Sequence, residues 1–145
     1  MIEKIYNKKL KEIEKIVGDK TTYLNDLDKA GVKIIGKKFK GVYPSDLIPK
    51  LTDNKCCCIL NLDKSGQPGT HWIAIYKFGN KTLCYDSFGR RNTQIITNLK
   101  FSGNGKIYDT ERDEEQKIME TNCGARCLSF LWCCKKYGFD IAKNI

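Results

Sequence analysis

The stretch HWIAIYKFGNKTLCYDSF, residues 71–88, decides the fold. Residues 71–78 and 81–88 are rich in aromatic and β-branched side chains, which favour β-strands. The Gly79-Asn80 pair between them is typical of a tight two-residue turn. We therefore predict a β-hairpin. Its pairing puts residues 86–88 roughly opposite residues 71–73, so that Asp86 lies beside His71.

Two further segments have the character of strands. The run CCCILNL, residues 56–62, is continuously apolar, as expected of a strand that is covered on both faces of a sheet. The segment KIYD, residues 106–109, is predicted to be the last strand. A short strand is also predicted over residues 32–35.

Helices are predicted on both sides of these strands. Apolar residues recur at helical spacing between Ile5 and Val17, which predicts an amphipathic helix that ends at Gly18. A short helical turn is expected over residues 45–48 and a helix over residues 90–100. We conclude that residues 1–145 form a single domain of the α+β class.

The segment ETNCGARCLSFLWCC, residues 120–134, is predicted to be a core helix, because it is apolar nearly all round. Gly138 is a suitable C-cap. Cys123 lies at the start of this helix, where the positive end of the helix dipole stabilises a thiolate. Three more cysteines lie deeper in the helix, where apolar burial makes thiols inert: Cys127, Cys133 and Cys134.

The eight cysteines favour neither a disulfide framework nor a metal site. Five of them are adjacent to another cysteine, at 56–58 and 133–134, and such runs suit small buried side chains. His71 is the sole histidine, and no paired C-x-x-C spacing is present. We predict no metal site, although a zinc site of three cysteines and His71 stays open as an alternative.

The composition is that of a globular protein with a basic surface. Apolar residues make up 41% of the chain and charged residues 30%, with a formal charge of +9. The charge is compatible with an acidic partner such as DNA. The N-terminal residues have no signal-peptide pattern and no stretch has the length of a membrane span, so we expect an intracellular protein with reduced thiols that is neither secreted nor membrane-bound.

A nucleophilic cysteine needs a base, and the base needs a group that orients it. His71 opens a strand after a loop that contains glycine and proline, and Asp86 is predicted to lie beside it. Gln116, seven residues before Cys123, can supply a side-chain amide to an oxyanion together with the Cys123 backbone N–H. Taken singly, each of these residues is more often structural. As a set, they predict a cysteine hydrolase.

The chain resembles the adenovirus-type maturation proteases in the order of His71-Trp72, Asp86, Gln116 and Cys123-Gly124. This family shares a clan with the ubiquitin-like-protein proteases. The resemblance is carried by GTHWIAIYKFGNKTLCYDSFG, residues 69–89, and QKIMETNCGARC, residues 116–127. It extends more faintly through TYLNDLDKAG and GVYPSDL, and so covers nearly the whole chain.

The resemblance implies a permuted papain-like fold, with a central mixed β-sheet against a buried catalytic helix, and a role for each site residue. Cys123 is then the nucleophile, His71 the base and later the acid, Asp86 the orienting acid and Gln116 the oxyanion donor. Trp72 and Gly124 are assigned to substrate binding, in a narrow channel that implies cleavage after small residues, as in Gly-X sites. The adenoviral enzymes usually carry Glu where this chain has Asp86, an acid that it shares with the ubiquitin-like-protein proteases.

The implied biology is the processing of viral capsid precursors by a monomeric thiol protease, in the virion and at its site of assembly in the host cell. A small DNA virus of the virophage kind is the expected source. No cofactor is needed for the chemistry. Stimulation by DNA or by an activating peptide is expected from the family, although residues 103–105 hold no cysteine for a disulfide-linked activator.

Three other functions stay open at this point. A ubiquitin- or SUMO-type deconjugating protease, and an acyltransferase, would use the same residues and the same chemistry. A basic structural protein that binds nucleic acid or zinc would use none of it. Bound metal would indicate the structural protein, and a single hyper-reactive thiol at Cys123 would indicate the enzyme.

Overall fold

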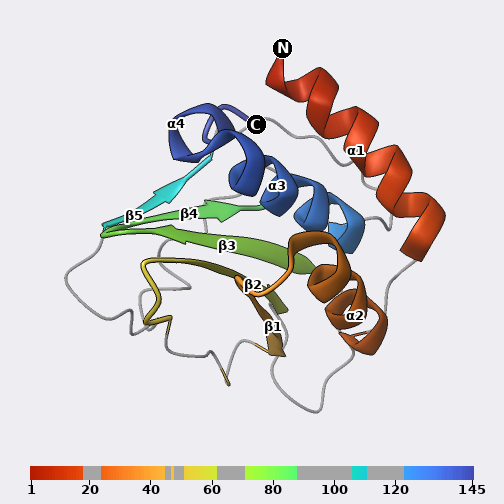
Figure 1. The fold of residues 1–145 in the computed structure, drawn as a ribbon, viewed down its shortest axis with the longest axis horizontal. Coiled ribbons are helices and arrows are strands. Elements are labelled where there is room, and N and C mark those ends of the chain that lie inside the picture. Colours follow the sequence, from red (N-terminus) through yellow and green to blue (C-terminus); the bar gives the residue numbers. More distant parts are fainter. Residues whose placement is uncertain (18–23, 45–46, 48–50, 62–70, 88–105, 111–122) are drawn as a thin grey trace.

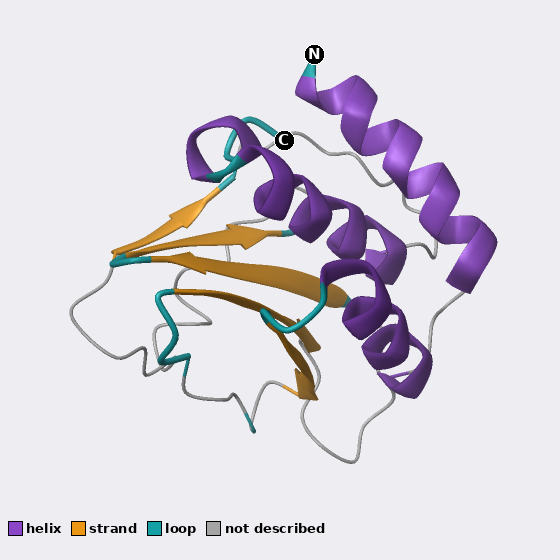
Figure 2. Cartoon of the chain, viewed as in Figure 1, coloured by secondary structure: helices purple, strands orange, loops and turns teal. Residues whose placement is uncertain are grey.

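The computed structural model describes residues 1–17, 24–44, 47, 51–61, 71–87, 106–110 and 123–145. Figure 1 shows helices gathered over one face of a twisted sheet, and Figure 2 shows the same two layers by type of element. The helices and strands, in chain order, are α1 (Ile2–Val17), α2 (Leu24–Ile35), β1 (Phe39–Pro44), β2 (Lys55–Asn61), β3 (Trp72–Phe78), β4 (Lys81–Tyr85), β5 (Lys106–Asp109), α3 (Cys123–Tyr137) and α4 (Phe139–Ala142).

The sheet has five strands in the order β1-β2-β3-β4-β5 and is mixed. The outer pairs, β1 with β2 and β4 with β5, are parallel. The inner pairs are antiparallel, and β3 and β4 form the predicted hairpin, with Ala74 opposite Tyr85 and Phe78 opposite Lys81. Gly79 in its turn has a φ of 61°, a conformation that glycine adopts without steric cost. The strands predicted over 56–62 and 106–109 correspond to β2 and β5.

Helix α3 crosses the sheet over β3, with α1 and α2 packed against it (Figure 1). Alternate strand residues meet these helices, as the two-residue period of a strand requires; they include Ile59, Trp72, Ala74, Tyr76, Leu83 and Tyr85. The intervening residues form a second buried cluster with Leu51, made of Cys56, Cys58, Leu60, Ile73, Ile75 and Cys84. Strand β2 is therefore buried on both faces, as its continuous apolar run predicts.

The predicted first helix is confirmed as α1, which buries Tyr6, Leu10 and Ile13. Ile16, which the apolar pattern placed in the same stripe, is exposed. The closing helix is confirmed as α3. Gly138 ends it with a φ of 87° and donates its backbone N–H to the carbonyl of Cys134.

The strand predicted over residues 32–35 is wrong, because these residues form the last turn of α2. Leu27, Ala30 and Ile35 are buried, whereas Val32 is 56% exposed. That spacing is helical, and it is visible only when the segment is considered together with the residues before it. Strand β1, which follows, was not predicted. The predicted segments 45–48, apart from Leu47, and 90–100 lie outside the described residues.

Close packing fixes α2 against β1. Gly31 faces the ring of Phe39, and a Cβ built on Gly31 would lie 2.3 Å from Phe39 Cε2. Lys135, in the last turn of α3, donates to the carbonyl oxygen of Ile35 at 2.7 Å. The C-terminal carbonyls of a helix lack partners within the helix, and here Lys135 of α3 satisfies one of those of α2. This bond joins the C-terminal ends of the two helices.

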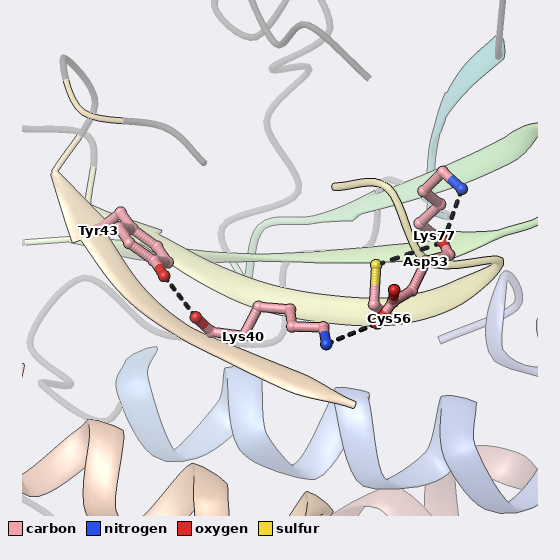
Figure 3. Close-up of polar contacts among 5 residues, drawn as sticks. All are labelled: Lys40, Tyr43, Asp53, Cys56 and Lys77. Carbon is pink, nitrogen blue, oxygen red and sulfur yellow. Dashed lines mark hydrogen bonds and ion pairs between the residues drawn. The ribbon is translucent and has the colours of Figure 1, made fainter. Parts of the chain in front are cut away.

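The turn that enters β2 is held by side chains from β1 and β3 (Figure 3). Lys77 on β3 donates to the backbone carbonyl of Asp53 at 2.7 Å, and Cys56 donates to the same oxygen at 3.6 Å. Lys40 on β1 forms an ion pair with the Asp53 carboxylate at 2.6 Å, and Tyr43 donates to the Lys40 carbonyl. Lys77 is buried, so its ammonium group needs this acceptor.

All eight cysteines are buried and free. This agrees with the prediction that the cysteine runs are packing residues rather than bridges. Within the described ranges, no helix is long and apolar enough to cross a membrane.

Candidate active site

Three chain segments that lie far apart in sequence meet at one end of the sheet. His71 directly precedes β3, Asp86 directly follows β4, and Cys123 is the first residue of α3. The hairpin brings the first two together because β3 and β4 are antiparallel and of similar length. The core packing of α3 over β3 brings the third.

The carboxylate of Asp86 holds the imidazole of His71. The distance from His71 Nε2 to Asp86 Oδ1 is 2.9 Å. The side chain of Asp86 is 1% exposed and that of His71 is 11% exposed, so this contact is sheltered from water. The bond leaves Nδ1 as the ring nitrogen for another partner, and Cys123 lies near enough to the imidazole to raise the pKa of His71.

These contacts favour the imidazolium form of His71. Burial alone lowers the pKa of His71. The interactions with Asp86 and Cys123 raise it by more than burial lowers it, so the net pKa lies above its usual value of 6.5. The cause is the stabilisation of the charged ring by two partners that can carry negative charge. A thiol beside a histidine of this kind can transfer its proton to the ring, which gives a thiolate–imidazolium pair.

Besides His71, the dipole of helix α3 acts on Cys123. Its N-terminus is buried, and the first turn holds no acidic residue. The positive end of the helix dipole at Cys123 is therefore not cancelled by a carboxylate of that turn. Cys123 itself is 4% exposed.

Burial has the opposite effect on the remaining thiols. It raises the pKa of Cys57 and of Cys133 to about 12, and it also raises the pKa of Cys56, Cys58, Cys84, Cys127 and Cys134. The prediction that Cys127, Cys133 and Cys134 are inert is consistent with this effect, since a protonated thiol is a poor nucleophile.

The other predicted site residues are placed only in part. Trp72, next to His71, is buried in β3 opposite Asn61. Its indole N–H has no hydrogen-bond partner among the residues that the structure describes. Gly124 follows Cys123 in the first turn of α3 and is buried. Gln116 lies outside the described residues.

A buried polar cluster behind the site was not predicted. Tyr6 on α1 is hydrogen-bonded through its hydroxyl to the hydroxyl of Tyr85, the last residue of β4. Arg126 on α3 donates to the same Tyr6 oxygen at 3.2 Å, and Ser129 donates to the Tyr6 backbone carbonyl at 2.6 Å. The one sequence signal for this cluster was Arg126, a charged residue in an otherwise apolar helix. A buried guanidinium must have hydrogen-bond partners.

No metal site is indicated in the part of the chain that the structure describes, where no three histidine, cysteine, aspartate or glutamate side chains are grouped to hold an ion. The arrangement of Cys123, His71 and Asp86 suits nucleophilic catalysis by a thiolate instead.

Comparison with known proteins agrees with this chemistry. No protein-family model matches the chain. The chain is similar to a protein of Acanthamoeba polyphaga mimivirus that carries the name "Putative thiol protease R355", with 32% identity over 120 residues. The match covers 65% of this chain and 39% of the mimivirus protein, so the chain spans about two fifths of the relative's length. The similarity supports a cysteine protease of viral type, and it does not reach to the adenoviral family in particular.

Proposed function

We propose that this chain is a cysteine endopeptidase in which Cys123 is the nucleophile, His71 the general base and acid, and Asp86 the residue that orients His71. One observation carries the proposal: the imidazole of His71 is hydrogen-bonded to Asp86, and Cys123, the first residue of α3, is near enough to raise the pKa of the ring. The mimivirus relative, which is named as a thiol protease, supports the same class of reaction.

The reaction follows from these contacts. The Cys123 thiolate attacks the carbonyl carbon of a peptide bond, and the carbonyl oxygen becomes an oxyanion. Protonated His71 then gives its proton to the departing amine, which leaves an acyl-enzyme thioester. Water, deprotonated by His71, attacks the thioester and releases the new carboxyl terminus together with the free thiol. Asp86 stabilises the imidazolium in each step and fixes the ring in place.

We assign the oxyanion contacts to the Cys123 backbone N–H and the side-chain amide of Gln116. This assignment rests on the sequence order of Gln116 and Cys123 and on the position of Cys123 at a helix N-terminus, where backbone N–H groups are not used within the helix. Trp72 and Gly124, which flank His71 and Cys123 in sequence, are proposed to bind the residues beside the scissile bond, with small residues such as glycine preferred.

The proposed substrates are viral capsid precursors, cleaved during virion maturation at the site of assembly, and the proposed catalytic unit is a monomeric single domain with a permuted papain-like fold. The chain order His71, Asp86, Cys123 supports the permutation, since in papain the cysteine comes first. DNA is proposed as a stimulating partner because of the +9 charge. A DNA effect that disappears in high salt would agree with this, because phosphate contacts are lost as salt rises.

The deciding experiment combines the purified chain with the capsid proteins encoded in the same genome and identifies new termini by mass spectrometry. Cleavage after a small residue is expected for the wild type, and none for Cys123→Ala. Cys127→Ala is the matched control, since it removes a buried thiol one turn further along α3 and should still cleave. Cleavage by Cys123→Ala would disprove the proposal. Cleavage of ubiquitin-like fusions, with capsid proteins left intact, would identify a deconjugating protease instead.

A further inference from the structure

One hydroxyl group on α1 is hydrogen-bonded both to the residue before Asp86 and to a residue one helical turn after Cys123. Tyr6 lies in α1, Tyr85 directly precedes Asp86, and Arg126 is one helical turn after Cys123. The Tyr6 hydroxyl is hydrogen-bonded to both Tyr85 and Arg126. It therefore links the strand end that supplies Asp86 to the first turn of the helix that supplies Cys123.

The side chains of the cluster are closely packed as well as hydrogen-bonded. Tyr6 and Tyr85 are each 1% exposed. The ring of Tyr85 stacks on Phe130 of α3, with centroids 4.5 Å apart and planes 5° apart, and the ring of Tyr6 meets Tyr85 edge-on. A side chain packed in this way has few rotamers, so a displacement at Tyr6 is transmitted to Tyr85 and Arg126 rather than absorbed.

Side-chain packing alone does not explain the polar atoms. Two buried hydroxyls and a buried guanidinium are costly unless each has partners. A phenylalanine at position 6 would fill the same space without this requirement. The hydroxyl therefore makes contacts that the ring does not, and its partners are the residue before Asp86 and a residue one helical turn after Cys123.

We propose that Tyr6 is a positioning residue of the proposed active site, which sets the relative placement of Asp86 and Cys123 through Tyr85 and Arg126. The inference rests on the proposed function. In this proposal α1 contributes no reacting group, and it fixes the position of Asp86 relative to Cys123. Without the hydroxyl, Asp86 shifts relative to His71 while α1 stays docked.

The test uses His71 as a reporter, because it is the sole histidine and its Cε1–H gives one NMR signal that can be titrated without a substrate. Asp86 and Cys123 are the groups that raise the pKa of His71. In Tyr6→Phe, the pKa of His71 is expected to fall below that of the wild type. Alkylation of Cys123 by iodoacetamide, followed by mass spectrometry at neutral pH, is expected to slow roughly tenfold, as misplaced catalytic groups do.

Ser129→Ala is the matched control. It removes the bond to the Tyr6 backbone carbonyl and so loosens the docking of α1, but leaves the hydroxyl contacts in place. It should lower the melting temperature while the His71 titration and the Cys123 alkylation rate stay as in the wild type. If the hydroxyls act as a unit, Tyr85→Phe should reproduce Tyr6→Phe, and the double variant should add little.

The outcomes separate the two proposals. If wild-type Cys123 is alkylated no faster than the other cysteines, the proposed function fails. If wild-type Cys123 reacts selectively but Tyr6→Phe leaves both the His71 titration and the alkylation rate unchanged, the positioning role of Tyr6 is overturned. Equal effects of Tyr6→Phe and Ser129→Ala on both readouts would also overturn it, since they would show that docking alone matters.

Discussion

His71 and Asp86 lie fifteen residues apart in the chain and are joined by a 2.9 Å hydrogen bond across one end of the β3–β4 hairpin. The two-residue turn at Gly79-Asn80 and the antiparallel register determine this meeting. Asp86 is almost fully buried and His71 is slightly exposed, so the acid supports the imidazole from the protein side. The strength of that support can be measured.

Replacement of Asp86 by Asn should keep the hairpin and remove the charge. The carboxylate is one of the groups that raise the pKa of His71, so the pKa of His71 should fall and the alkaline limit of activity should move to lower pH. The turnover number should drop by about 10³- to 10⁴-fold, as for the orienting acid of other triads. Measurement of kcat/KM against pH tests this, and an unchanged alkaline limit would contradict the orienting role.

The stability of the fold should depend on pH through His71. Because the folded-state pKa is raised above 6.5, the stabilising contribution is complete below the unfolded-state pKa and is lost as the pH rises through the folded-state pKa. The difference in Tm between wild type and His71→Gln should therefore be largest below about pH 6.5 and should shrink as the pH rises above it. A difference that grows over this range would show that His71 is buried in its neutral form.

The eight thiols should react at two very different rates. Burial raises the pKa of seven of them, so a thiol-reactive dye should label the native protein rapidly at one site, Cys123, and label the others only upon unfolding. Cys123→Ala should abolish the fast phase, and Cys133→Ala should retain it. Two or more fast thiols in the native wild type would contradict this division.

Gln116 is expected to act on the transition state rather than on binding. Gln116→Ala should lower kcat by roughly a hundredfold or more if its amide stabilises the oxyanion, with KM little changed. Steady-state kinetics on a peptide that spans a cleavage site would measure both constants. A wild-type rate would remove Gln116 from the site and leave the backbone N–H of Cys123 as the assigned donor.

Gly31→Ala offers a test of the packing between α2 and β1. In an exposed helix, this substitution usually stabilises by up to about 1 kcal/mol. Here the added methyl would lie 2.3 Å from Phe39 Cε2, so the free energy of unfolding should instead fall by about 1–3 kcal/mol. Urea denaturation measures the change. Lys33→Ala, at an exposed position of the same helix, is the control and should have little effect.

The parts of the fold that could be predicted are those with local signals. The hairpin depends on a turn pair between two strand-like runs, and α3 depends on an apolar run that ends at Gly138. The last turn of α2 was mistaken for a strand because Val32 to Ile35 are β-branched apart from Lys33, and the helical spacing depends on Leu27 and Ala30 upstream.

The polar cluster behind the site had one local signal, Arg126 in an otherwise apolar helix, and nothing in the sequence indicated its partners. Tyr6 is 79 residues from Tyr85 and 120 residues from Arg126, and in its own helix it is one more apolar position. Only the packing of α1 over α3 shows which groups its hydroxyl contacts. Long-range hydrogen bonds of this kind depend on tertiary geometry, which a hydrophobic pattern does not encode.

The two-residue turn between β3 and β4 limits how this protein can change over time. Side chains alternate along a strand, so one residue inserted or deleted between positions 72 and 85 would turn every following β4 side chain to the opposite face. Asp86 would then leave His71 even though both residues were still present. The length of the hairpin is therefore as constrained as the proposed catalytic residues, and a related chain that has lost a residue here should have lost the proposed activity too.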